Sequence, residues 1–193
     1  MKRTLALLLT LACAAPAAAQ AQPPHDNVAS AVTTTDGSHV ADFAWDVTRQ
    51  SGGDVDQLNS ATAQATCTDC GATAIAFQIV LVSGTSGSLT PHNRAVAVND
   101  QCTRCVVAAE ARQFVRVVDE PARFTGEGMQ QLADIHQNLR ALSQADLSVA
   151  DLHAAVEREE ARVMDVMAND VVPKADPDGT LGVRAARVLQ AAG

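Results

Sequence analysis

Small and polar residues alternate along the middle of the chain, and the same pattern occurs there twice. The copies read Asn59-x-Ala61-x-Ala63, Cys67-x-x-Cys70, Ala74-x-Ala76-x-Gln78 and then Asn93-x-Ala95-x-Ala97, Cys102-x-x-Cys105, Ala109-x-Ala111-x-Gln113. The first Cys and the Gln are eleven positions apart in both copies. Alternation of this kind predicts a short strand before each CxxC, with small side chains on a closely packed face.

After each first cysteine the period changes to steps of three and four residues. One such set is Cys67, Cys70, Ala74, Phe77, Gln78 and Leu81, and the other is Cys102, Cys105, Ala109, Arg112, Gln113 and Arg116. This spacing predicts two helices, each with a CxxC in its first turn. The β-branched residues leave a strand open for Ile79–Val82. We expect two β–CxxC–α repeats related by a pseudo-twofold axis.

The segment before the repeats predicts an antiparallel hairpin. Val28–Thr35 and Ser38–Arg49 flank Asp36-Gly37, a strong two-residue turn signal. In that pairing Val28 faces Trp45, and Phe43 shares the same apolar face. We therefore expect Phe43 and Trp45 to lie in the core.

The segment after the repeats predicts two antiparallel helices. Thr125 is a candidate N-cap, and Ser148 with Asp151 resembles a capping box. The apolar stripes comprise Met129, Leu132, Ile135, Leu139 and Leu142, then Val149, Leu152, Val156, Val163, Val166 and Met167. These stripes need a partner, either the Cys unit or another chain.

The first residues have the pattern of an export signal: two cations, a short apolar run and small residues. We predict a signal peptide at 1–21, a disordered leader at 22–27, an α/β repeat domain at 28–118, a helical hairpin at 119–171 and a flexible tail at 172–193. The expected fold class is α+β, in a secreted chain without a transmembrane segment. A minor alternative is a lipid anchor through Cys13.

Composition narrows the classes of partner. The formal net charge is −8, and aromatic residues make up 3% of the chain. An acidic surface argues against nucleic acid, and few aromatic rings argue against a carbohydrate platform. The expected partner is an unidentified protein or component of the cell envelope, and the oligomeric state stays open.

The four cysteines of the repeats allow three functions. The first is structural disulfides, closed within each CxxC or across the repeats in one of two ways, because paired cysteines in exported chains are usually oxidised. The second is a zinc site, since two CxxC motifs have tetrathiolate spacing. The third is a thiol–disulfide oxidoreductase, since a strand followed by CxxC at a helix start lowers a thiol pKa. Asp69 opposes a thiolate there, and Arg104 is the only favourable charge.

Other candidate chemistry is sparse. Gln78 and Gln113 occupy equivalent positions and form a possible polar pair, either satisfying backbone groups or lining a shared binding site. His153 and Glu157 are spaced as a surface pair on a helix. The chain has no His-Glu-x-x-His, no phosphate-binding loop and no spacing that predicts a catalytic triad.

The run from Asn59 to Val115, with Ala-Ile-Ala-Phe-Gln-Ile-Val-Leu-Val and both CxxC motifs, resembles an exported module of actinobacteria. It is similar to the extracellular part of membrane proteins labelled putative peptide zinc metalloproteases, and the likeness extends through Arg123-Phe124-Thr125. The function of that family is not established, and no protease motif is present here. The sequence thus favours a secreted, disulfide-stabilised, non-enzymatic interaction module without a cofactor, with zinc binding and redox catalysis as alternatives.

Overall fold

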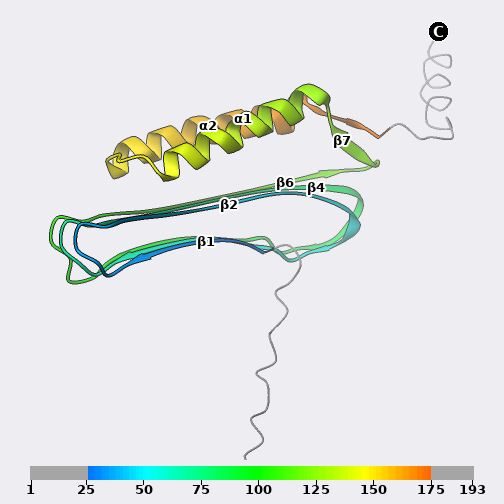
Figure 1. Ribbon diagram of the computed structural model, residues 1–193. Helices are drawn as coiled ribbons and strands as arrows, with labels where there is room; N and C mark the ends of the chain where they lie inside the picture. The colour runs from blue at the N-terminus through cyan, green and yellow to red at the C-terminus, as the bar shows by residue number, and fades with distance from the viewer. Residues whose placement is uncertain (1–25, 175–193) are drawn as a thin grey trace, which may run out of the picture.

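The computed structural model describes residues 26–174, and these form a short β-solenoid covered on one side by two helices (Figure 1). The chain winds through three coils, and each coil gives one strand to each of two parallel sheets. The first sheet contains β1 (Asn27–Thr33), β3 (Leu58–Ala65) and β5 (His92–Asn99). The second contains β2 (His39–Val55), β4 (Gly71–Leu89) and β6 (Val106–Val118).

Equivalent residues of successive coils stack directly on one another. In the first sheet Asn27 pairs with Asn59, 32 residues on, and Asn59 with Asn93, 34 residues on. In the second sheet Gln78 pairs with Gln113. Every pair within the two large sheets is parallel, so a translation along the solenoid relates the coils. The predicted pseudo-twofold axis is therefore wrong.

Small side chains fill the space between the two sheets. Ala61 and Ala63 of β3 are fully buried and form an alanine cluster with Ala74 and Ala76 of β4, while the buried Ala65 packs against Cys67 and Cys70. The alternation of small residues thus predicted the strands β3 and β5 correctly. An interior of alanine lets two sheets approach closely and needs few aromatic residues.

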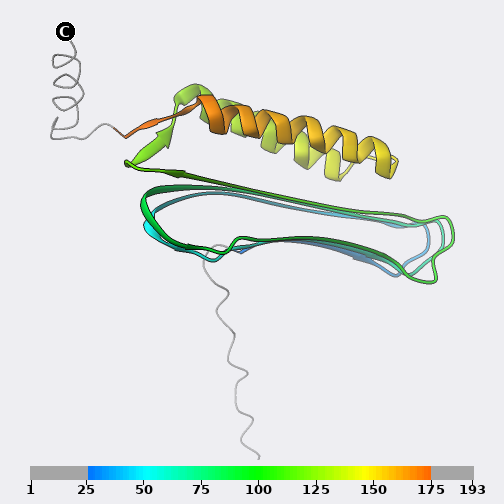
Figure 2. The same ribbon diagram turned by 180° about the vertical axis from the view of Figure 1, so that it is seen from behind.

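The outer face of the second sheet forms the larger apolar core. Figures 1 and 2 show the helices α1 (Gly126–Ser143) and α2 (Val149–Asn169) lying side by side over this face. The buried residues shared by sheet and helices are Ile75, Phe77, Ile79, Leu81, Leu132, Ile135, Leu139, Leu152, Val156, Val163, Val166 and Met167. The predicted helical hairpin is confirmed, and its partner is the Cys-containing solenoid.

Side chains cap both helices where the sequence predicts it. The Thr125 hydroxyl accepts a hydrogen bond from the Gly128 N–H at 2.9 Å, and the Ser148 hydroxyl accepts one from the Asp151 N–H at 3.1 Å. A small antiparallel sheet of β7 (Ala122–Phe124) and β8 (Val171–Pro173) joins the two ends of the hairpin. The predicted signal peptide, Cys13 and the tail beyond Lys174 lie outside the described residues.

The predicted antiparallel hairpin about Asp36-Gly37 is wrong. β1 and β2 lie in different sheets, and each pairs in parallel with a strand of the next coil. Val28 and Val32 are exposed, whereas Phe43 and Trp45 are partly buried and pack against the helix-covered core. The Asp-Gly turn is real, but it carries the chain between layers instead of folding it back within one sheet.

The predicted helices after each CxxC are also wrong. Their residues form β4 and β6, in agreement with the alternative left open for Ile79–Val82. A strand buried on both faces has a nearly continuous apolar sequence, so periods of three to four residues arise in it by chance. In β4 the odd positions from Ile75 to Leu81 face the helices, while the even positions from Ala74 to Val82 face the first sheet.

Candidate functional site: a cysteine cluster and the two solenoid ends

Both CxxC motifs form the turns that carry the chain from the first sheet to the second. The two turns stack, with Thr68 bridged to Thr103, the Asp69 N–H donating to the Thr103 carbonyl at 2.9 Å and the Thr103 N–H donating to the Cys67 carbonyl at 3.2 Å. Asp69 and Arg104, the residues before the second cysteines, have φ of 53° and 57°. This left-handed conformation turns the chain sharply and brings the two cysteines of each motif together.

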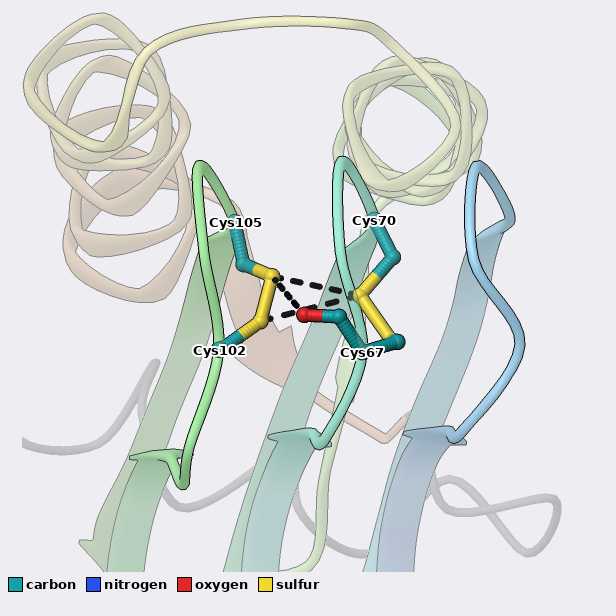
Figure 3. Close-up of side chains that lie close together, drawn as sticks. All are labelled: Cys67, Cys70, Cys102 and Cys105. Atoms are coloured by element: carbon teal, nitrogen blue, oxygen red, sulfur yellow. Dashed lines mark hydrogen bonds between the residues drawn. A yellow bond between two sulfur atoms is a disulfide. The ribbon is translucent and has the colours of Figure 1, made fainter.

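The disulfides join Cys67 to Cys70 and Cys102 to Cys105, so each motif closes on itself (Figure 3). Of the three pairings that the sequence allows, this one closes the shortest loops. On the chain-entropy model such a short loop stabilises the fold by only about 2 kcal/mol. These bonds therefore fix the shape of a turn more than they hold the coils together.

The four sulfur atoms form one cluster. All four Sγ atoms lie within 4.8 Å of one another, and Cys70 Sγ is 3.2 Å from Cys105 Sγ and 3.7 Å from Cys102 Sγ. Cys67 and Cys70 are buried, and Cys102 and Cys105 are half-buried. In a tetrahedral zinc tetrathiolate the sulfurs are about 3.8 Å apart, given bonds of about 2.3 Å. The same four residues could therefore hold a thiophilic metal ion in the reduced state.

Charges beside the cluster do not favour a reactive thiolate. Asp69 accepts two hydrogen bonds from Arg104, and this ion pair lowers the pKa of the Asp69 carboxyl and raises the pKa of Arg104. The positive charge of Arg104 is thus neutralised by Asp69 of the neighbouring coil. No helix begins at either CxxC in the described chain, so the helix dipole expected to lower a thiol pKa is missing. Both features weaken the oxidoreductase interpretation.

The first coil has the same turn without cysteines. Asp36 and Gly37 stand where the later coils carry CxxC: the Thr68 N–H donates to Asp36 Oδ1 at 2.7 Å, and the Gly37 N–H donates to the Thr68 carbonyl at 2.9 Å. Asn27-x-Ala29-x-Ala31 begins this coil, so the unit occurs three times along the chain. The sequence carried this signal, but it was missed because the first copy lacks the CxxC.

The predicted polar pair belongs to a row of hydrogen-bonded side chains in which Gln78 is buried and Gln113 and Asp46 are partly buried. Gln113 Nε2 donates to Gln78 Oε1 at 2.7 Å and to the Gln57 carbonyl at 3.1 Å. Gln78 Nε2 lies 3.5 Å from Asp46 Oδ2 in the first coil. The pair thus lies side by side on neighbouring strands, where it satisfies buried polar groups, and this geometry favours the structural interpretation.

A cluster of charges that the sequence did not predict fastens α2 to the third coil. Glu110 is buried on the outer face of β6, where it accepts from Arg112 at 3.0 Å and contacts His153 Nδ1 at 2.9 Å. Arg112 also pairs with Glu160 of α2. The hydrogen bond with Glu110 is the main cause that raises the pKa of His153, which also makes the predicted helix-surface contact with Glu157 at 3.2 Å.

The two ends of the solenoid differ. Ala29 and Ala31 of the first coil are fully buried, but Ala95 and Ala97, which hold the same register positions in the third coil, are exposed. The space between the sheets is therefore closed at the first coil and open at the third. The sequence alone gives no sign of this, since both coils carry the same alanines.

Asp42 closes the edge of the first coil. Its carboxylate accepts hydrogen bonds from the Ser30 N–H at 2.6 Å and the Phe43 N–H at 2.9 Å, one in each of the outermost strands. An inward-pointing charge that occupies edge N–H groups is a known defence against strand addition. Ala109 stands at the register position of Asp42 in the third coil and offers no such acceptor.

Comparison of the chain with models of protein families, with curated proteins and with solved structures gave no match. Between residues 26 and 174, neither helix is long and apolar enough to cross a membrane. The function proposed below therefore rests on the geometry of the fold and of the candidate site.

Proposed function

We propose that the protein is a secreted, disulfide-stabilised and non-enzymatic interaction module that acts outside the cell or at its envelope. Export is supported by the signal-like first residues, and an extracellular role by the resemblance to the actinobacterial module. The structural observation that supports an interaction function is the open end of the solenoid. There, among residues 26–174, no further strand pairs with the outer edges of β5 and β6, and Ala95 and Ala97 are exposed.

The chemistry of this end favours a polypeptide partner that adds an extended strand. An unpaired strand edge presents N–H and C=O groups in a row, and main-chain hydrogen bonds to such an edge are a common mode of peptide recognition. The contrast with the other end supports this choice. The first coil carries Asp42 as a block, while the third coil has alanine at the equivalent position.

Stacking of a second copy in the same direction is unfavourable because of the helices. Three strands span about 14 Å at about 4.8 Å each, but two helices packed side by side need about 18–20 Å. α1 contacts β2 and β4, whereas α2 contacts β6. Figure 3 shows α2 extending beyond β6, so an in-register copy would bring its own α1 into α2. A slim extended segment avoids this clash.

The test places a carboxylate at the open end. A displayed library of random peptides is selected on the wild-type protein and on Ala109→Asp, which puts a charged side chain at the register position of Asp42 in the third coil. We expect peptides enriched on the wild type to lose binding to Ala109→Asp. The matched control is Val28→Asp, an exposed position at the closed end, which should bind normally. Equal binding by all three proteins would refute the open end as the site.

Zinc binding is the second candidate function, and the observation that favours it is the gathering of four Sγ atoms within 4.8 Å. Elemental analysis of protein kept reduced from expression onward decides it. One zinc per chain supports the tetrathiolate site, and its absence rejects it. Thiol titration of the untreated protein is the complementary measurement, because four free thiols would reject the disulfide basis of the first proposal.

A further inference from the structure

Disulfide formation and metal binding at the cluster use the same sulfur atoms. The bonds Cys67–Cys70 and Cys102–Cys105 lie in neighbouring coils, yet Cys70 Sγ is 3.2 Å from Cys105 Sγ. A tetrathiolate site needs all four sulfurs as ligands, and each disulfide removes two of them. The two states therefore exclude each other.

We propose that the cluster is a redox-controlled zinc site, which binds one zinc ion when reduced and releases it when a small-molecule disulfide oxidises the four thiolates. This inference rests on the second candidate function and adds to it the regulation of the site. The stacking of successive turns, which the first coil shares without any cysteine, brings the four sulfurs to this distance.

The reaction balances with two molecules of the oxidant, RSSR. In each half, one zinc-bound thiolate attacks RSSR to give a mixed disulfide and one RS⁻, and the other cysteine of the same CxxC then displaces the second RS⁻. Two protein disulfides form, four electrons pass to two RSSR molecules, and Zn²⁺ leaves with four RS⁻ in solution. No proton is transferred, because the four ligands are thiolates before the reaction.

The backbone of the site can stay in place during this exchange. Three main-chain hydrogen bonds stack the turns: Asp69 N–H to Thr103 C=O, Thr103 N–H to Cys67 C=O and Val106 N–H to Cys70 C=O at 3.1 Å. These three bonds use no sulfur atom. Cys105 Sγ also lies 3.1 Å from the Cys67 carbonyl oxygen, and rotation of its side chain breaks only that contact. Cys102 and Cys105 are the more exposed pair, which gives the oxidant its route of entry.

The two states connect the coils differently. Each disulfide lies within one turn, whereas a metal bound by all four cysteines would tie the second coil to the third. The third coil is also the one whose edge is open. Zinc binding should therefore reduce the opening of β5 and β6 in the reduced protein, which hydrogen exchange can follow.

The experiment uses the full chain, reduced with a phosphine under nitrogen and loaded with zinc. Native mass spectrometry should find one zinc per chain. Glutathione disulfide is then titrated in, with released zinc read by a chromogenic chelator and protein disulfides read by mass. We expect both readings to rise together and to end at two equivalents of glutathione disulfide. Zinc that stays bound while disulfides form, or no zinc at the start, would overturn the proposal.

Variants test whether the four cysteines are the zinc ligands, and the different outcomes distinguish failure of the redox control from failure of the zinc site. Removing one motif with Cys102→Ser and Cys105→Ser should weaken zinc binding by roughly 100-fold or more, while Thr103→Ala in the same turn should bind zinc normally. If the double variant does not fold, cobalt loading of the wild type provides the readout, since tetrahedral thiolate ligation gives a characteristic absorption. Zinc that binds but is not released rejects the redox control alone. Failure to bind zinc rejects the second candidate, and the peptide selection still tests the first.

Discussion

The side-chain amide of Asn59 donates to Oδ1 of Asn93 at 2.8 Å across two coils of the solenoid, and Asn59 Oδ1 in turn accepts from Asn27 Nδ2 at 2.7 Å. The central residue also donates to the carbonyls of Ala76 at 3.2 Å and Arg112 at 3.0 Å in the opposite sheet. The ladder therefore fixes the register of one sheet and ties it to the other. Buried amide groups that are fully bonded in this way specify a single arrangement of strands.

We expect Asn59→Ala to be strongly destabilising. It leaves the carbonyls of Ala76 and Arg112 without this donor inside the solenoid, at a cost of about 2–4 kcal/mol in the free energy of unfolding. Urea denaturation measures the change. Asn138→Ala, on an exposed face of α1, is the control and should change the free energy by less than about 0.5 kcal/mol. A small effect at Asn59 would mean that the ladder does not hold the sheets together.

Alanines at the same register position should respond differently to enlargement. Ala63 is fully buried between the sheets, whereas Ala97, its neighbour in the next coil, is exposed at the open end. Ala63→Leu must force the sheets apart, with an expected loss of about 3 kcal/mol or more. Ala97→Leu should be nearly neutral. Thermal denaturation of both variants checks this, and similar losses would show that the third coil is closed in solution.

Protonation of His153 should stabilise the fold. Its pKa is raised in the folded state, chiefly by the hydrogen bond with Glu110, so the folded protein binds the proton more tightly than the unfolded chain does. The contribution is fully present below the unfolded pKa of about 6.5 and is lost as the pH rises through the folded pKa. Stability of the wild type should fall relative to His153→Gln as the pH rises from 5.5 to 8. High salt should reduce the difference, since the imidazole is half exposed.

The N-cap at Thr125 should matter more than the one at Ser148. The Thr125 hydroxyl accepts from the Gly128 N–H and donates to Asp170 Oδ1, so it joins the start of α1 to the end of α2. We expect Thr125→Ala to lower the free energy of unfolding by about 1–2 kcal/mol and Ser148→Ala by about 1 kcal/mol. Circular dichroism under denaturant measures both. A larger effect at Ser148 would contradict the role of Asp170.

Elements with local signals could be predicted from the sequence. The helical hairpin was predictable because its apolar stripes repeat over many residues and its caps lie at Thr125 and Ser148. The strands before each CxxC were predictable from alternating alanines. The clustering of the cysteines came from the repeat itself, since equal spacing in two copies brings equal residues together.

The pairing of the strands, and the type of element after each CxxC, depend on contacts between segments that are distant in the sequence. The residues of β4 are buried on both faces, by alanines on one side and by the helices on the other, so their sequence lacks the alternation that identifies a strand. The Asp36-Gly37 turn is compatible with a hairpin or with a change of layer, and contacts with the next coil choose the second. The difference between the closed and the open end also depends on the fold, because a residue's exposure is set by whether another coil or a side chain such as Asp42 lies beside it.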